Sequence, residues 1–183
     1  MLIAESREKL KYKGKDMSTT SSEEFKHLAS LIRGIKTAML TTACADGSLR
    51  SRPMATLERE FDGTLWFFTH ADAPKVGEVQ QERQVNVSYA DADGQRFVSV
   101  SGRAALVLDR KKNQELWNPA YKAWFPKGLD DPQIALLRVE AEKAEYWDAQ
   151  SSAMLQLMSL VKGLVTGQSC PPGESKKVDL SVA

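Results

Sequence analysis

The stretch from residue 38 to residue 76, AMLTTACADGSLRSRPMATLEREFDGTLWFFTHADAPKV, decides the fold. Its first run, residues 39–42, is rich in β-forming side chains and leads to an Asp-Gly turn, the dipeptide that best suits a tight hairpin. The run at residues 49–59 should therefore pair back on the first. A second Asp-Gly turn precedes the short aromatic run at residues 65–69, so the stretch predicts an antiparallel meander of three strands.

The second run carries two arginines and a proline that go beyond the needs of a structural strand. Arg50 and Arg52 lie two positions apart, so in a regular strand both guanidinium groups project from the same face. Pro53 follows at once, and because proline cannot donate a ladder hydrogen bond it favours an edge strand or a bulge. The run predicts a sheet edge at which a ligand can approach two cations.

The residues after the third run offer further groups that bind phosphate. Thr69, His70 and Lys75 supply a hydroxyl, a ring nitrogen and an ammonium group beside a helix start at Pro74. Backbone N–H groups are unpaired at a helix start, and the helix dipole favours an anion there. Solvated strand charges and an ordinary capped turn explain the same residues, and spacing alone does not decide between these interpretations.

Length and charge favour one globular domain with no overall attraction to nucleic acid or membranes. The chain has 183 residues, of which 42% are hydrophobic and 27% are charged, and this size allows one substantial core. Its 25 basic and 24 acidic residues nearly cancel, so any anion site has to be local. We expect neither a nucleic-acid partner nor a membrane partner.

The cysteines, the histidines and the N-terminal residues favour a cytoplasmic protein without a metal site. Cys44 and Cys170 are the only cysteines, too few for a disulfide framework or a cysteine-based metal cluster. His27 and His70 have no cysteine or carboxylate partner at a ligand-like interval. The first four residues are followed at once by charged residues, and no apolar run approaches the length of a membrane span.

We divide the chain into an arm, one domain and a tail. Residues 1–22 are polar, with alternating lysines and then a Ser/Thr cluster, which predicts a flexible arm. Residues 23–166 form the single folded domain, including a C-terminal helix, and residues 167–183 form a flexible tail. Binding of RNA or an acidic partner by the basic arm is an alternative, although the arm has few aromatic side chains to stack on bases.

The remaining patterns predict flanking helices and three more strands. Helices are expected at residues 22–33, 76–82, 109–117 and 151–165, and strands at residues 84–90, 96–108 and 134–147. Gly102 lies inside the second of these strands and permits a bend or a close backbone approach. A helix is the rival for the third, but a strand is preferred because five strands would leave an open edge. The prediction is a mainly β (α+β) fold with six strands.

An aromatic segment follows the helix that is predicted at residues 109–117. Tyr121, Trp124 and Phe125 crowd into a stretch punctuated by Pro and Gly, and a surface loop would expose them. Three interpretations stay open for this segment: a plug on the barrel, a subunit contact or a cover over a ligand.

The order of these segments resembles the flavin-binding split-barrel superfamily typified by pyridoxamine 5′-phosphate oxidase. The motifs that carry the resemblance are SRPM at residues 51–54 and FFTH at residues 67–70, followed by Lys75. The match is closer to the general stress protein branch of small bacterial flavoproteins, and it runs from Phe25 to Trp147. It implies a six-stranded antiparallel Greek-key split β-barrel of the FMN-binding type, a homodimer, and FMN as the cofactor, with FAD or another flavin as alternatives.

The resemblance also implies roles for particular residues. Arg52, and less directly Arg50, would face the phosphate or the flavin edge. Thr69 and Lys75 would hold phosphate oxygens, and His70 would lie beside the ribityl chain. Backbone near the SRPM motif would line the ring, and aromatic side chains of the partner subunit would cover it. The implied cofactor-binding residues are Arg50, Ser51, Arg52, Pro53, Met54, Thr69, His70, Lys75, Trp117, Trp124 and Phe125.

The C-terminal part departs from the true oxidases of this superfamily. The basic residues that those enzymes use at the pyridoxal phosphate site have no counterpart after Trp147, where the chain continues with Asp-Ala-Gln and an apolar segment. A pyridoxamine phosphate oxidase is therefore not expected.

The resemblance leads to an FMN-dependent oxidoreductase of unknown substrate, with the flavin at the homodimer interface. Electrons would pass to or from NADH, NADPH or a small oxidised substrate, and the flavin would do the chemistry. A flavin-binding or flavin-sensing module without turnover is an alternative that the sequence does not separate from the enzyme. A third reading is a small-barrel interaction protein that uses the aromatic segment and the basic arm.

Overall fold

The computed structural model describes residues 17–148 and 175–180 of the chain. The predicted arm before residue 17 and the predicted final helix at residues 151–165 lie outside the described residues. The elements in chain order are α1 (Met17–Ile32), β1 (Thr37–Ala43), β2 (Leu49–Ala55), β3 (Thr64–His70), α2 (Pro74–Gln81), β4 (Gln84–Asp91), β5 (Arg96–Val107), α3 (Arg110–Leu116), η1 (Pro119–Ala123), η2 (Gly128–Asp130), β6 (Ile134–Asp148) and β7 (Lys176–Asp179).

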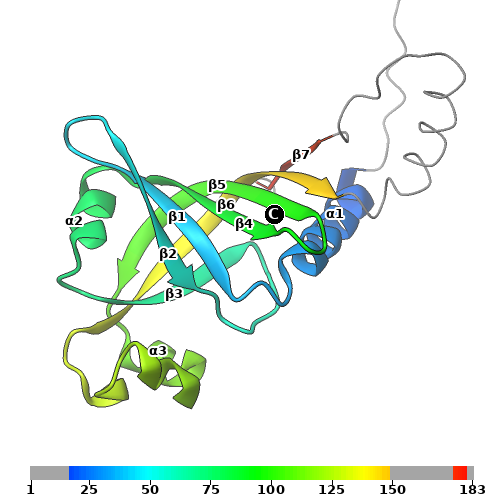
Figure 1. Cartoon of the computed structure of the whole chain (residues 1–183). Coiled ribbons are helices and arrows are strands. Elements are labelled where there is room, and N and C mark those ends of the chain that lie inside the picture. Colours follow the sequence, from blue (N-terminus) through cyan, green and yellow to red (C-terminus); the bar gives the residue numbers. More distant parts are fainter. Residues whose placement is uncertain (1–16, 149–174, 181–183) are drawn as a thin grey trace, which may run out of the picture.

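The strands form one antiparallel, curled sheet in the order β2-β1-β4-β5-β6-β3 (Figure 1). β3 pairs with the first half of β6, and β7 pairs with residues 143–146 in its second half. The sheet is not closed: β2 and β3 approach each other at the two edges without sharing a ladder. These features confirm the predicted mainly β split-barrel fold with flanking helices, and they confirm a strand rather than a helix at β6.

The predicted three-strand meander is correct for its first hairpin only. β1 and β2 pair from Ala43 opposite Leu49 to Thr37 opposite Ala55, as the Asp-Gly turn predicts. β3 does not pair with β2, because the connection at residues 56–63 carries it to the far edge of the sheet, where it pairs with β6. β2 is therefore an edge strand, which agrees with the presence of the exposed Pro53 in it.

The structure differs from the prediction at the start of α1 and in the predicted C-terminal tail. α1 begins at Met17 rather than at Ser22, since residues 17–22 contain neither Gly nor Pro to stop the helix. β7 lies inside the segment predicted as a flexible tail. Its four residues pair with β6, because the second half of that long strand would otherwise present unpaired backbone groups along one edge.

The core lies between the inner face of the sheet and α1. Alternate side chains of β1, β4, β5 and β6 are buried there together with the apolar stripe of α1, and the central ones are Leu28, Leu31, Leu40, Val87, Val100 and Val139. Figure 1 shows α1 at one end of the sheet and α2 beside the β1–β2 hairpin. No helix among the described residues is long and apolar enough to cross a membrane.

Gly102 lies where the pairing between β5 and β6 is irregular. The β5–β6 register shifts between Ser101 and Gly102, and a Cβ atom at Gly102 would clash with the backbone carbonyl oxygen of Glu140. The predicted close backbone approach is confirmed, since only glycine fits where the bulged strands touch.

Candidate functional site

Two arginines of β2 converge on one carboxylate of α2. Arg52 Nη1 lies 2.7 Å from Glu78 Oε2, and Arg50 Nη1 lies 3.1 Å from Glu78 Oε1. The Thr42 hydroxyl donates to Glu78 Oε2 at 2.5 Å and accepts from Arg52 Nη1 at 3.2 Å. These four residues form one hydrogen-bonded group, which we name the arginine cluster.

Strand register explains why the arginine cluster forms. Arg50 lies opposite Thr42 and Arg52 lies opposite Leu40, so both arginines share the inner face of the hairpin with buried side chains of β1. This confirms the prediction that the two guanidinium groups leave the same face. α2 packs against β1 and brings Glu78 onto this face.

Lys75 adds a third cation beside the arginine cluster. It follows Pro74, the first residue of α2, and lies one helical turn before Glu78. Burial lowers the pKa of the Lys75 ammonium, the positive charge of Arg52 lowers it further, and Glu78 raises it in part. Lys75 and Arg52 are therefore close enough to repel each other. Three cations lie around Glu78, and Asp46 of the hairpin turn acts on Arg50 alone, so a positive surplus remains at this edge of the barrel.

Thr69 and His70, at the end of β3, point elsewhere in this structure. Thr69 is buried, and its hydroxyl donates to the His70 carbonyl oxygen at 3.3 Å. His70 Nε2 lies 3.6 Å from Asp131 Oδ2, and its ring lies edge-on to Phe125 with centroids 5.0 Å apart. Among the described residues, neither Thr69 nor His70 forms a side-chain hydrogen bond or ion pair with an arginine of the cluster or with Lys75.

The other residues of the SRPM motif divide between the two faces of the sheet. The Ser51 hydroxyl pairs with the Thr41 hydroxyl at 2.7 Å on the outer face, where Pro53 is exposed beside Met39. The Met54 side chain is buried in the core. Only the backbone of Met54 can therefore contact a ligand at this edge.

The predicted aromatic residues also divide into two groups. Trp117, Tyr121 and Phe125 surround Phe68 of β3, with ring centroids 5.4, 5.4 and 6.1 Å from it. This cluster favours the plug interpretation, because these side chains pack within the chain. Trp124 remains 61% exposed, so among the aromatic residues of this segment it is the one most open to a ligand or a second subunit.

Glu78 and Thr42 are the members of the arginine cluster that sequence reasoning missed. Lys75 and Glu78 are three positions apart in a helix, so they share one side of it. Thr42 continues the inward alternation after Ala38 and Leu40, which makes it a polar side chain at a core position. Both signals were present in the sequence, but only the fold brings the two residues to the arginines.

Comparisons with known proteins agree with the fold. Residues 23–171 match the family described as pyridoxamine 5′-phosphate oxidase like. The chain is similar to Protein bli-3 of Neurospora crassa, with 26% identity over 89% of this chain and 83% of that protein.

Solved structures of bacterial stress proteins are also similar. A general stress FMN/FAD binding protein from Xanthomonas citri shares 31% identity over 69% of this chain and 89% of that chain, with a TM-score of 0.60. A protein related to general stress protein 26 from Clostridium acetobutylicum has a TM-score of 0.66 over 86% of this chain and 95% of that chain. Its identity is 16%, so this second likeness concerns the fold alone.

Proposed function

Because the chain belongs to the pyridoxamine 5′-phosphate oxidase-like family, we propose that it binds FMN with the phosphate at Arg52 and Lys75. The observation that carries the proposal is the gathering of Arg50, Arg52 and Lys75 at one sheet edge around a single carboxylate. The similar Xanthomonas citri protein is named for FMN or FAD binding, which supports a flavin rather than another phosphorylated ligand.

The charges of the site fit a phosphate monoester. Three cations outnumber Glu78 and the more distant charge of Asp46 at Arg50, and the positive surplus suits the about 1.5 to 2 negative charges of a phosphate monoester at neutral pH. Guanidinium groups donate in a fork that suits phosphate oxygens, and such charge-assisted hydrogen bonds are stronger than neutral ones. The lowered pKa of Lys75, caused first by burial and then by Arg52, fits as well, because a bound dianion would offset both effects.

The proposal also gives a role to residues outside the arginine cluster. The Thr69 hydroxyl would turn from the His70 carbonyl to a phosphate oxygen, and His70 would lie beside the ribityl chain. The ring would rest against the backbone at Pro53 and Met54, where β2 is an open edge. Trp124 of the partner subunit in a homodimer would cover the ring.

When bound, the flavin supplies the redox chemistry, and the protein's part is to hold and orient it. NADH or NADPH is the proposed electron source for an FMN-dependent oxidoreductase. A flavin-binding module without turnover uses the same residues, so the distinction depends on electron transfer rather than on binding.

Purification of the full chain with added FMN, followed by absorbance spectroscopy, tests this proposal. We expect a yellow dimer whose flavin absorbance bleaches with NADH or NADPH in the absence of oxygen and returns in air. A yellow protein that neither nucleotide reduces would favour the module without turnover. A chain with no affinity for FMN would remove the flavin proposal.

A further inference from the structure

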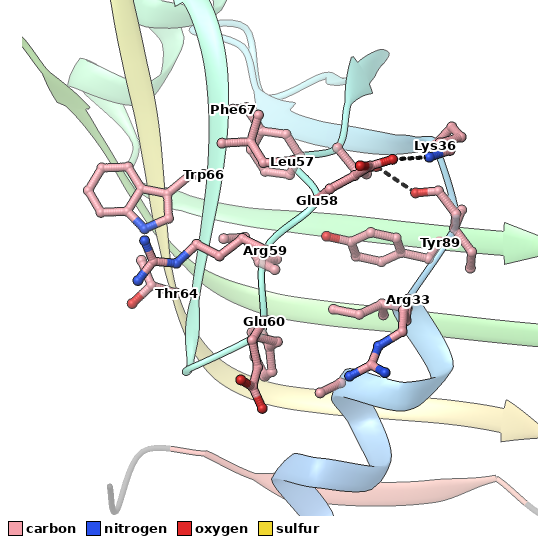
Figure 2. A pocket seen from close by; sticks show the side chains of 17 residues that line it. Arg33, Lys36, Leu57, Glu58, Arg59, Glu60, Thr64, Trp66, Phe67 and Tyr89 are labelled. Atoms are coloured by element: carbon pink, nitrogen blue, oxygen red, sulfur yellow. Dashed lines mark hydrogen bonds and ion pairs between the residues drawn. The ribbon is translucent and has the colours of Figure 1, made fainter. Parts of the chain in front are cut away.

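A cavity of about 430 Å³ opens between the end of α1 and the connection from β2 to β3 (Figure 2). Its volume lies within the range of about 300–1,000 Å³ that small-molecule sites occupy. Apolar and aromatic side chains line it, among them Ile32, Leu65 and Phe67, and charged side chains surround them. None of the residues assigned to FMN lines this cavity.

Tyr89 gives the cavity an unpaired polar group. Tyr89 as a whole is 4% exposed, and Figure 2 shows its hydroxyl directed into the cavity from β4. Within residues 17–148 and 175–180, no hydrogen-bond partner lies within reach of this hydroxyl. Burial raises the pKa of the Tyr89 phenol, so the group stays neutral. Because Tyr89 lines the cavity, a polar atom of a bound molecule could pair with this hydroxyl.

Arg33 supplies a cation at the same cavity. Lys36 pairs with Glu58, and Arg59 pairs with Asp62 and Glu115 at 3.1 and 3.2 Å. Arg33, at the end of α1, lines the cavity and forms no ion pair with any described residue. The Glu60 carboxylate also belongs to the lining, but Figure 2 shows it turned away from Tyr89.

We propose that this cavity binds a small hydroxylated aromatic carboxylic acid. The ring would lie among the aromatic side chains of Phe67 and Tyr89, where edge and face contacts are favourable. The ring hydroxyl would pair with the Tyr89 hydroxyl, and the carboxylate would pair with Arg33. The site uses no residue of the arginine cluster and does not depend on the proposed flavin function.

Three matched probes test the proposal by calorimetric titration of the full chain: a hydroxynaphthoic acid, naphthoic acid without the hydroxyl, and naphthol without the carboxylate. Tyr89→Phe keeps the buried ring and removes one oxygen. It should weaken hydroxynaphthoate about five- to tenfold and leave naphthoate unchanged. Arg33→Gln should weaken both carboxylates by a similar factor and leave naphthol unchanged.

Controls separate this site from folding defects and from the flavin site. Arg110→Gln changes an exposed arginine of α3 outside the cavity and should bind every probe as the parent chain does. Thermal unfolding of each variant shows that the fold is retained. No binding by the parent chain, equal hydroxynaphthoate affinity for the parent chain and Tyr89→Phe, or displacement of the probe by FMN would each overturn the inference. A chain that fails to bind FMN but binds the probes as described would not contradict the proposed cavity site.

Discussion

Glu78 of α2 holds Arg52 of β2 in an ion pair of 2.7 Å, and the two side chains are 12% and 18% exposed. The pair is shielded from solvent, so its charges act strongly on any group that enters the cluster. Thr42 donates to the same carboxylate. In the proposed complex the phosphate meets Arg52 while this carboxylate is present, and Glu78 therefore limits the affinity for anions.

Glu78→Gln should bind FMN about three- to tenfold more tightly, because the substitution removes a negative charge close to the phosphate. Riboflavin, which lacks the phosphate, should bind unchanged. Titration of flavin fluorescence measures both affinities, and Glu23→Gln, an exposed acidic residue of α1, is the matched control. Weaker FMN binding by Glu78→Gln would show that the carboxylate positions the arginines instead of competing with the phosphate.

Without bound flavin, Glu78→Gln should lower the free energy of unfolding by about 1–3 kcal/mol at neutral pH, because two arginines lose their carboxylate partner. Hydrogen bonding from Arg52 holds the Glu78 pKa below its ordinary value of 4.5, and Thr42 and the two arginine charges lower it further against burial. A lowered folded-state pKa stabilises the fold above the unfolded-state value, and this contribution disappears as the pH falls through the folded-state pKa. Urea unfolding should show the two proteins converging below pH 4.5. A difference that does not change with pH would contradict this origin.

Gly102→Ala should destabilise the fold by about 1–3 kcal/mol or more, because a Cβ atom would clash with the Glu140 carbonyl at the bulge. Gly77→Ala is the matched control. It lies inside α2 with open space around it and should stabilise by about 0.5–1 kcal/mol. Urea unfolding of both variants measures the contrast, and equal stability would remove the close approach as the reason for Gly102.

Trp124→Ala should leave the free energy of unfolding within about 0.5 kcal/mol, because the side chain is 61% exposed. If Trp124 covers the flavin ring that is bound to the partner subunit, Trp124→Ala should alter the fluorescence of the bound flavin. Leu108→Ala, 71% exposed, is the control and should alter neither property. An unchanged flavin spectrum in Trp124→Ala would exclude this residue as the cover.

Local patterns were enough to predict β1 to β6, but they predicted neither β7 nor all of the strand pairings. An Asp-Gly turn fixes a hairpin because it leaves one short connection, and β1 and β2 pair as that rule requires. The longer connection at residues 56–63 imposes no partner on β3, which pairs with the first half of β6. β7 is short and polar, with no strand signal of its own, and it forms because part of β6 offers an edge.

Local spacing likewise predicted only part of the candidate site. Period-two spacing correctly places Arg50 and Arg52 on one face. Glu78 escaped prediction because it lies 28 positions from Arg50 and reaches it only through the packing of α2 on β1. The aromatic segment has no periodicity, so no local pattern encodes the partial burial of Trp117 and Phe125 against Phe68 or the exposure of Trp124.

The phosphate assignment is tested most directly by comparing FMN and riboflavin binding in the parent chain, Arg52→Ala and Lys75→Ala, with Lys111→Ala of α3 as an exposed control. Each site variant should bind FMN about 10- to 150-fold more weakly, as expected for a lost charge-assisted contact. Riboflavin affinity should stay within about twofold of the parent chain in every variant. Equal losses for both ligands, or no loss of FMN binding, would contradict a phosphate site at Arg52 and Lys75.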